Sequence, residues 1–207
     1  MLDNNGFNLW AENYNESVTL SDDNKEYPFA AYKKILNEIY NRVLKTNGKK
    51  VLDIGFGTGN LASHLYEKGY KIYGQDFSEK MIKTAQEKMP NARLYKGDFT
   101  KGLVEDLRKQ RYDVIIATYS LHHLKDSQKI SFIKSLLLLL NEGGKIFIGD
   151  VAFERRKDLE SCKLKAGKYR DDEEIYFVYE EIKEYLPNLV FEKYSFCSAL
   201  LSISNKR

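Results

Sequence analysis

The sequence predicts an α/β fold, an open and doubly wound sheet of mainly parallel strands with helices on both faces. Short apolar runs alternate with amphipathic stretches through the middle of the 207 residues, which is the order typical of βαβ units. Residues 114–117 and 146–148 are continuously apolar, as expected of parallel strands buried on both faces. Glycine or proline follows several of the helical stretches, where helices commonly end.

The elements follow in order along the chain. We expect strands at residues 50–54, 70–75, 92–95, 112–118 and 145–150, with helices at residues 58–68, 79–89, 103–110 and 127–140. Residues 1–48 predict an appendage, a loop and then a helix over about 29–44, attached to one domain at 49–207. A helical insertion is expected over about 153–186, clearest at 173–185. Residues 190–196 and 200–204 then predict an antiparallel hairpin, because few residues separate them.

Composition argues against several classes of function. The 33 Lys and Arg are interleaved with 30 Asp and Glu, for a net charge of +3, which argues against nucleic acid as a partner. The longest apolar run, residues 136–140, is far shorter than the roughly 20 residues of a membrane span. The amino terminus also lacks a signal-peptide pattern, and we expect a cytoplasmic protein without a membrane. Cys162 and Cys197 lack ligand spacing, so reduced thiols and no metal are expected.

A glycine-rich segment, VLDIGFGTGN, begins in the first expected strand. It places Gly55, Gly57 and Gly59 at alternate positions. Ligands of open parallel sheets bind beyond the carboxyl ends of the strands, and glycine there lets the backbone turn sharply and approach a ligand closely. The segment therefore indicates a nucleotide-type cofactor, without choosing between a dinucleotide and an adenosyl group.

Three acidic residues near the ends of successive strands narrow this choice. Asp53 stands where dinucleotide sites are apolar, and it can organise the loop beside a cationic amino-acid group. Asp76 ends the second strand, where a carboxylate can accept hydrogen bonds from both ribose hydroxyls. Asp98 and Phe99 follow the third strand and suit the amino group and ring face of an adenine.

Together the D-x-G-x-G-x-G loop, YGQDFS and KGDF resemble the class I S-adenosylmethionine-dependent methyltransferases over about residues 50–150. WAENYNESV, YPFAAYKKIL and YSLHHL are similar to the YrrT-type bacterial methyltransferases, which act on small molecules or are functionally unassigned. The resemblance implies a Rossmann-like, seven-stranded sheet with an antiparallel C-terminal strand. It also implies S-adenosyl-L-methionine as cofactor, S-adenosyl-L-homocysteine as product and a small-molecule methyl acceptor.

The resemblance also assigns site residues. It places Asp53, Gly55, Gly57 and Gly59 around the methionine moiety, Asp76 at the ribose, Phe77, Met81, Asp98 and Phe99 around the adenine, and Thr118 and Tyr119 near the sulfonium. The aromatic residues Trp10, Tyr14, Tyr27 and Tyr32 are expected either to form a lid or to pack the appendage on the sheet. Tyr14 is preferred for cofactor contact, and Tyr169 and Tyr176 are expected to form the opposite wall.

Candidates for acceptor chemistry lie just after the fourth strand. Methyl transfer mainly needs alignment of the reacting atoms, and it needs a base only if the acceptor loses a proton. Tyr119, His122 and His123 are the candidate catalytic residues, since histidine can take a proton near neutral pH. A purely structural role for the histidines, with one holding the turn, stays open. The N/D-P-P-Y/F loop of nucleobase methylases is absent.

Other functions also stay open. Tyr179 and Lys183 have the Tyr-x-x-x-Lys spacing of short-chain reductases, but the glycine spacing differs and we interpret them as an ordinary helix pair. RNA or protein could be the acceptor, and a non-catalytic protein that binds S-adenosylmethionine or S-adenosylhomocysteine would use the same fold. We expect a monomer or a homodimer.

Overall fold

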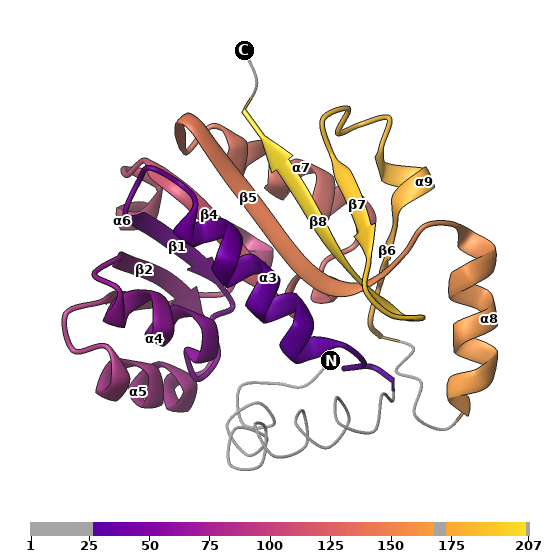
Figure 1. Ribbon diagram of the computed structural model, residues 1–207, viewed down its shortest axis with the longest axis horizontal. Coiled ribbons are helices and arrows are strands. Elements are labelled where there is room, and N and C mark those ends of the chain that lie inside the picture. The colour runs from indigo at the N-terminus through magenta and orange to yellow at the C-terminus, as the bar shows by residue number, and fades with distance from the viewer. Residues whose placement is uncertain (1–26, 168–172, 206–207) are drawn as a thin grey trace.

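The computed structural model describes residues 27–167 and 173–205. Its strands, shown in Figure 1, are β1 (Lys50–Ile54), β2 (Lys71–Asp76), β3 (Arg93–Lys96), β4 (Tyr112–Thr118), β5 (Leu140–Phe153), β6 (Phe177–Val178), β7 (Val190–Lys193) and β8 (Ser198–Ser204). In these described residues they form one eight-stranded sheet with the order β3-β2-β1-β4-β5-β8-β7, and β6 pairs with β5 off this path. The strands from β3 to β5 are parallel, and β8 is antiparallel to both neighbours. The predicted fold class is confirmed, and the short strand β6 is an addition to the seven strands expected.

Helices cover both faces of the sheet, because consecutive residues of the central strands are apolar and their side chains point to opposite faces in turn. They are α3 (Tyr32–Leu44), α4 (Asn60–Glu67), α5 (Glu79–Lys88), α6 (Glu105–Arg108), α7 (Asp126–Leu137), α8 (Arg156–Ala166) and α9 (Tyr179–Ile182). Val114 and Ile116 of β4 join the core beneath α3, α4 and α5, whereas Ile115 joins the core beneath α6 and α7. Figure 1 shows α3 in front of the sheet and α7 behind it.

Helix α3 lies directly against β5 and also reaches the edge strand. A Cβ atom at Gly149 would stand 2.5 Å from Cγ2 of Ile35, so glycine permits this close approach. Arg42 donates two hydrogen bonds, of 2.6 and 2.7 Å, to the carboxylate of Glu192 on β7. The predicted N-terminal helix therefore exists, although it begins at Tyr32.

The helix predicted over residues 173–185 is wrong for residues 173–178, and only Tyr179–Ile182 of it, α9, is helical. Tyr176 and Val178 are buried in one core and Phe177 in the other, which is the alternation of a strand. Phe177 pairs with Ala152 of β5 in parallel register, and α9 starts only after this pairing. The charged residues around the segment gave a helical pattern, but tertiary burial of three consecutive side chains decides its structure.

Smaller differences concern the ends of elements. The helix predicted at 103–110 is limited to Glu105–Arg108, and the helix predicted at 127–140 ends at Leu137. Gly143 and Gly144, which follow that predicted helix in the sequence, lie inside β5, because Leu140 already pairs with Tyr112. Within the described ranges, none of the helices has the length and apolar character to cross a bilayer.

The contact between α3 and β5 generates a prediction about stability. Gly149→Ala should lower the free energy of unfolding by about 1–3 kcal/mol, because the added methyl group overlaps Ile35. Urea unfolding followed by circular dichroism measures the loss. In the double variant with Ile35→Ala the combined loss should be smaller than the sum of the two single losses. Strict additivity would contradict the contact.

Candidate active site

The glycine segment forms a left-handed loop between β1 and α4. Gly55, Gly57 and Gly59 have φ angles of +66°, +54° and +73°, a region that residues with a side chain rarely adopt. At Gly55 a Cβ atom would also stand 2.5 Å from Cβ of Ser120, in the loop after β4. The backbone geometry thus requires these glycines, and it brings the loops after β1 and β4 together.

Asp76 holds the glycine loop in place. Its Oδ2 accepts a hydrogen bond of 2.8 Å from the backbone N–H of Gly57, and its Oδ1 accepts one of 2.9 Å from that of Ser78. Burial raises the pKa of Asp76 above its ordinary value, although these N–H groups favour the charged form. The Asp76 carboxylate therefore stabilises the glycine loop, in addition to any contact that it makes with a ligand.

Asp53 is a buried carboxyl group with an unsatisfied oxygen. The residue is 2% exposed, and its Oδ1 has no hydrogen-bond partner among the residues that the structure describes. Burial, and then the neighbouring Asp76 carboxylate, raise the pKa of Asp53 to about 8. A buried polar atom without a partner is costly, so this oxygen fits a ligand that brings a donor or a positive charge to the glycine loop.

The residues expected around an adenine lie near the ends of β2 and β3. Met81 is buried at the start of α5, where its N–H binds the Ser78 hydroxyl. Asp98 accepts hydrogen bonds from the backbone and the hydroxyl of Thr100. Burial opposes ionisation of Asp98, but Thr100 and Lys101 outweigh it and lower its pKa. The ring of Phe99 stacks on Phe132 in the core, with 6.2 Å between ring centroids.

Tyr119 lies in an aromatic cluster just after Thr118, the last residue of β4. Its ring centroid is 5.1 Å from that of Tyr32 and 5.3 Å from that of Phe29. Burial and then the Asp150 carboxylate raise the pKa of Tyr119 well above its ordinary value. The phenol therefore stays protonated near neutral pH and is unsuited to act as a base. Tyr119 also has a left-handed φ of 49°.

His122 makes an ion pair that no spacing in the sequence indicated. Its Nδ1 lies 2.7 Å from Oδ1 of Asp150, a fully buried residue of β5. Asp150 also accepts hydrogen bonds from the backbone N–H groups of Leu121 and Val151. His123 is less buried, and its ring centroid is 4.3 Å from that of His122. The Asp150 carboxylate therefore lies directly against the ring of His122.

A second group of residues near His122 comes from the segment before β6. Glu174 Oε1 lies 3.5 Å from Nε2 of His122, and the hydroxyl of Tyr176 donates a 2.5 Å hydrogen bond to Oε2 of Glu174. The hydroxyls of Tyr176 and Tyr27 are hydrogen-bonded to each other. The sequence predicts Tyr27 in a lid or in the packing of the appendage, and Tyr176 in the opposite wall. No pattern in the sequence indicated Asp150 or Glu174. Trp10, Tyr14 and Tyr169 lie outside the described residues.

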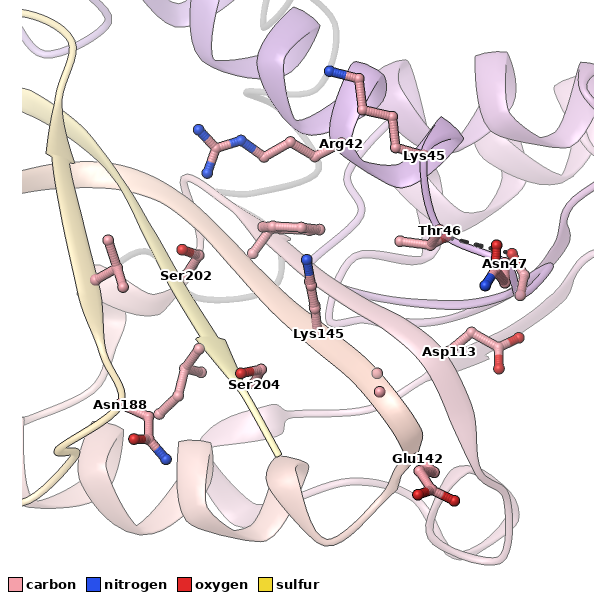
Figure 2. A pocket seen from close by; sticks show the side chains of 16 residues that line it. Arg42, Lys45, Thr46, Asn47, Asp113, Glu142, Lys145, Asn188, Ser202 and Ser204 are labelled. Atoms are coloured by element: carbon pink, nitrogen blue, oxygen red, sulfur yellow. Dashed lines mark hydrogen bonds between the residues drawn. The ribbon is translucent and has the colours of Figure 1, made fainter. Parts of the chain in front are cut away.

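A groove of about 730 Å³ lies at the opposite end of the sheet, at the amino ends of β4 and β5 (Figure 2). Its walls include Arg42 and Lys45 of the α3 region, Asp113 of β4, Lys145 of β5 and Ser202 of β8. None of the residues that the sequence indicated for a site lines it. The groove is thus separate from the carboxyl-end cluster around the glycine loop.

Known sequences resemble this chain closely. A family described as a methyltransferase domain matches residues 51–144. An uncharacterised methyltransferase of Anoxybacillus flavithermus is 37% identical over 160 residues, which cover 77% of this chain and 72% of that protein. An uncharacterised methyltransferase of Oceanobacillus iheyensis is 33% identical over 193 residues, covering 92% of this chain and 87% of that protein.

Solved structures share the fold at low identity. An S-adenosylmethionine-dependent methyltransferase from Clostridium acetobutylicum has a TM-score of 0.68 at 17% identity, covering 94% of this chain and 99% of that chain. Magnesium protoporphyrin IX methyltransferase from Synechocystis, with bound S-adenosylhomocysteine, has a TM-score of 0.66 at 19% identity, with 86% and 85% covered. A ribosomal protein L11 methylase from Lactobacillus delbrueckii has a TM-score of 0.57 at 17% identity, with 84% and 79% covered.

The site and the relatives lead to one assignment. A left-handed glycine loop follows β1, acidic residues lie near the ends of three successive strands, and the relatives share sequence across most of the chain. This chain therefore belongs to the methyltransferase family of these relatives, and it has the class I fold that S-adenosylmethionine-dependent methyltransferases share.

Proposed function

We propose that this methyltransferase acts on a small-molecule acceptor bound between the loop after β4 and the segment before β6. The observation that carries the proposal is the hydrogen bond between the Tyr27 and Tyr176 hydroxyls. It joins the segment before α3 to the segment before β6. Phe29, Tyr32 and Tyr119 pack together nearby in the same core. A cluster of aromatic groups beside the end of β4 suits a small acceptor better than a long polymer.

S-adenosylmethionine supplies a methyl group on a cationic sulfur. The buried Oδ1 of Asp53 is suited to bind the amino group of its methionine moiety, beside Gly55, Gly57 and Gly59. In the same proposal Asp76 binds the ribose, Phe77, Met81, Asp98 and Phe99 surround the adenine, and Thr118 and Tyr119 border the sulfur. Contact between Tyr14 and the cofactor remains a prediction. The N-terminal lid, a cytoplasmic location and a monomeric or dimeric state also remain predictions.

Among the three candidate catalytic residues, His122 has the best support. Its pKa lies above the ordinary value, since Asp150 and Glu174 outweigh the effect of burial. The raised pKa of Tyr119 argues against that phenol as a base, whereas the imidazole of His122 lies against the Asp150 carboxylate. We assign His122 to the acceptor side of the site.

The fold alone leaves other acceptors open, because proteins of this fold methylate a porphyrin and a ribosomal protein. Transfer of label from methyl-tritiated S-adenosylmethionine into a fractionated cell extract tests the proposal, with heat-inactivated protein as control. We expect label in the small-molecule fraction. Label that nuclease or protease releases would contradict the proposal in favour of RNA or protein. Binding of S-adenosylhomocysteine without any transfer would indicate a non-catalytic binding protein.

Asp53 predicts a pH-dependent stability in the absence of cofactor. Its pKa in the folded protein, about 8, lies above the value of about 4 in an unfolded chain. Its contribution to stability is therefore complete below about pH 4 and is lost as the pH rises towards 8, by up to ~1.4 kcal/mol per pH unit. Relative to Asp53→Asn, the wild-type free energy of unfolding should fall across this window.

Urea unfolding at several pH values checks this expectation. Asp106→Asn, at an exposed position of α6, is the matched control, and its pH profile should follow that of the wild type. Parallel profiles for the wild type and Asp53→Asn would show that Asp53 ionises normally. Such a result would also contradict the proposal that Oδ1 of Asp53 binds the amino group of the methionine moiety.

Asp76→Asn should weaken binding of S-adenosylhomocysteine by about 10–100-fold. The substitution removes one of the two oxygens that hold Gly57 and Ser78, and hydrogen bonds to a charged group contribute about 1.5–3 kcal/mol. Isothermal titration calorimetry measures the affinity, with Asp106→Asn as control and circular dichroism to confirm folding. Wild-type affinity in a folded Asp76→Asn protein would refute the placement of the ribose.

A further inference from the structure

The imidazole of His122 lies between two carboxylates from different parts of the chain. On one side, Nδ1 is 2.7 Å from Oδ1 of Asp150, within the C-terminal half of β5. On the other, Nε2 is 3.5 Å from Oε1 of Glu174, in the segment before β6. The side chains of Asp150 and His122 are 0% and 9% exposed, whereas that of Glu174 is 24% exposed. The three side chains, in the order Asp150, His122 and Glu174, therefore lead from the protein interior towards solvent.

Asp150 determines the tautomer of the ring. An ionised carboxylate only accepts hydrogen bonds, so Nδ1 must carry a proton to bind Oδ1. The neutral ring then has its free electron pair on Nε2. Two backbone N–H groups, from Leu121 and Val151, hold the Asp150 carboxylate. This is the arrangement of a histidine prepared to accept a proton at Nε2.

Glu174 is held beside Nε2 by contacts of its own segment. Its Oε2 accepts the hydrogen bond from Tyr176. The N–H of the next residue, Ile175, donates a 2.9 Å hydrogen bond to the carbonyl of His122, and the buried amine of Lys129 binds the carbonyl of Ile175. The carboxylate is thus fixed to the loop that carries His122.

Several charged and titratable groups face this ring. Asp150 and Glu174 favour the imidazolium, whereas Lys129, on α7, opposes it. The ring of His123, in the same loop, and that of Tyr176 lie at centroid distances of 4.3 and 6.3 Å. Burial is the largest single effect and favours the neutral ring, but the two carboxylates outweigh it and raise the pKa of His122.

We propose that Asp150 and Glu174 are positioning residues that prepare His122 to take a proton from the methyl acceptor, so that the acceptor has an ionisable O–H or S–H group. This inference rests on the proposed methyl transfer. A thioether or a tertiary amine has no proton to lose and would need no such base. His122, held between two carboxylates, can serve as a base only for an acceptor that must be deprotonated.

The step conserves atoms and charge. The acceptor X–H gives its proton to Nε2 of His122 while the X–C bond forms. The C–S bond breaks at the same time, and its electron pair stays on sulfur. Sulfur thereby becomes a neutral thioether, and the imidazolium is stabilised between Asp150 and Glu174. The proton then passes to solvent on the more exposed side, where Glu174 lies.

Nuclear magnetic resonance of the cofactor-free protein tests the arrangement without any turnover. The chain has three histidines, so long-range ¹H–¹⁵N spectra can resolve their rings, and His122→Asn identifies the signals of His122. We expect the neutral ring to carry its proton on Nδ1. Glu174→Gln should lower the titration midpoint by roughly 0.5–1 pH unit, because a nearby opposite charge is removed. The partly exposed position of Glu174 should let this variant fold.

Glu142→Gln, in the groove at the opposite end of the sheet, is the matched control and should leave the midpoint of His122 unchanged. A neutral ring protonated on Nε2 would overturn the proposal, as would a Glu174→Gln midpoint equal to that of the wild type. Asp150→Asn, if folded, should move the midpoint further in the same direction and change the tautomer.

The label-transfer assay then tests the role in the reaction. Transfer should rise with pH as His122 loses its proton, and in Glu174→Gln this rise should move to lower pH by the shift that the spectra measure. The product should gain CH₂ without a change of charge. The inference would be overturned, while the proposed function stands, if the pH dependence of transfer were the same in Glu174→Gln as in the wild type. It would also be overturned if the product gained CH₃ together with a fixed positive charge. If the wild type transferred no label to small molecules, the proposed function would itself fail.

Discussion

Parallel pairing of β2, β1, β4 and β5 is the constraint on which the candidate site depends. The register places Asp53 of β1 beside Gly74 of β2 and Ile116 of β4, and Thr118 of β4 beside Gly149 of β5. Because parallel strands end at the same edge, the loops that follow them meet there. Residues far apart in the sequence thereby form one cluster, whereas the groove in Figure 2 lies at the other edge.

This edge gathers buried carboxyl groups, and the protein stabilises them in different ways. Asp76 accepts hydrogen bonds from the glycine loop, and Asp150 binds a histidine and two backbone N–H groups. Asp53 alone of these three keeps an oxygen without a partner in the described part of the chain. Two satisfied carboxylates organise the loops, and the unsatisfied one suits the positive charge of a methionine moiety.

The sequence predicted the central sheet well because the signals there are local. Continuous apolar runs mark strands buried on both faces, and Gly55, Gly57 and Gly59 mark a backbone turn that other residues would strain. The acidic residues next to these strands could be assigned to a cofactor edge for the same reason. Residues 173–185 misled the prediction, since their charged pattern resembles a helix while Tyr176, Phe177 and Val178 alternate between two cores.

By itself the sequence determined the α/β class, the position of the glycine loop and the methyltransferase resemblance, since each depends on neighbouring residues or fixed spacing. Only the tertiary structure decided which of the candidate residues make ion pairs. His122 meets Asp150, 28 residues away, and Glu174, 52 residues away, and the Tyr27 hydroxyl meets that of Tyr176. Such contacts arise because β5 extends past the end of β4, beside the loop that follows β4, and because pairing of β6 with β5 brings Glu174 back to that loop. The spacing of residues along the sequence does not show which of these side chains lie close together in the folded protein.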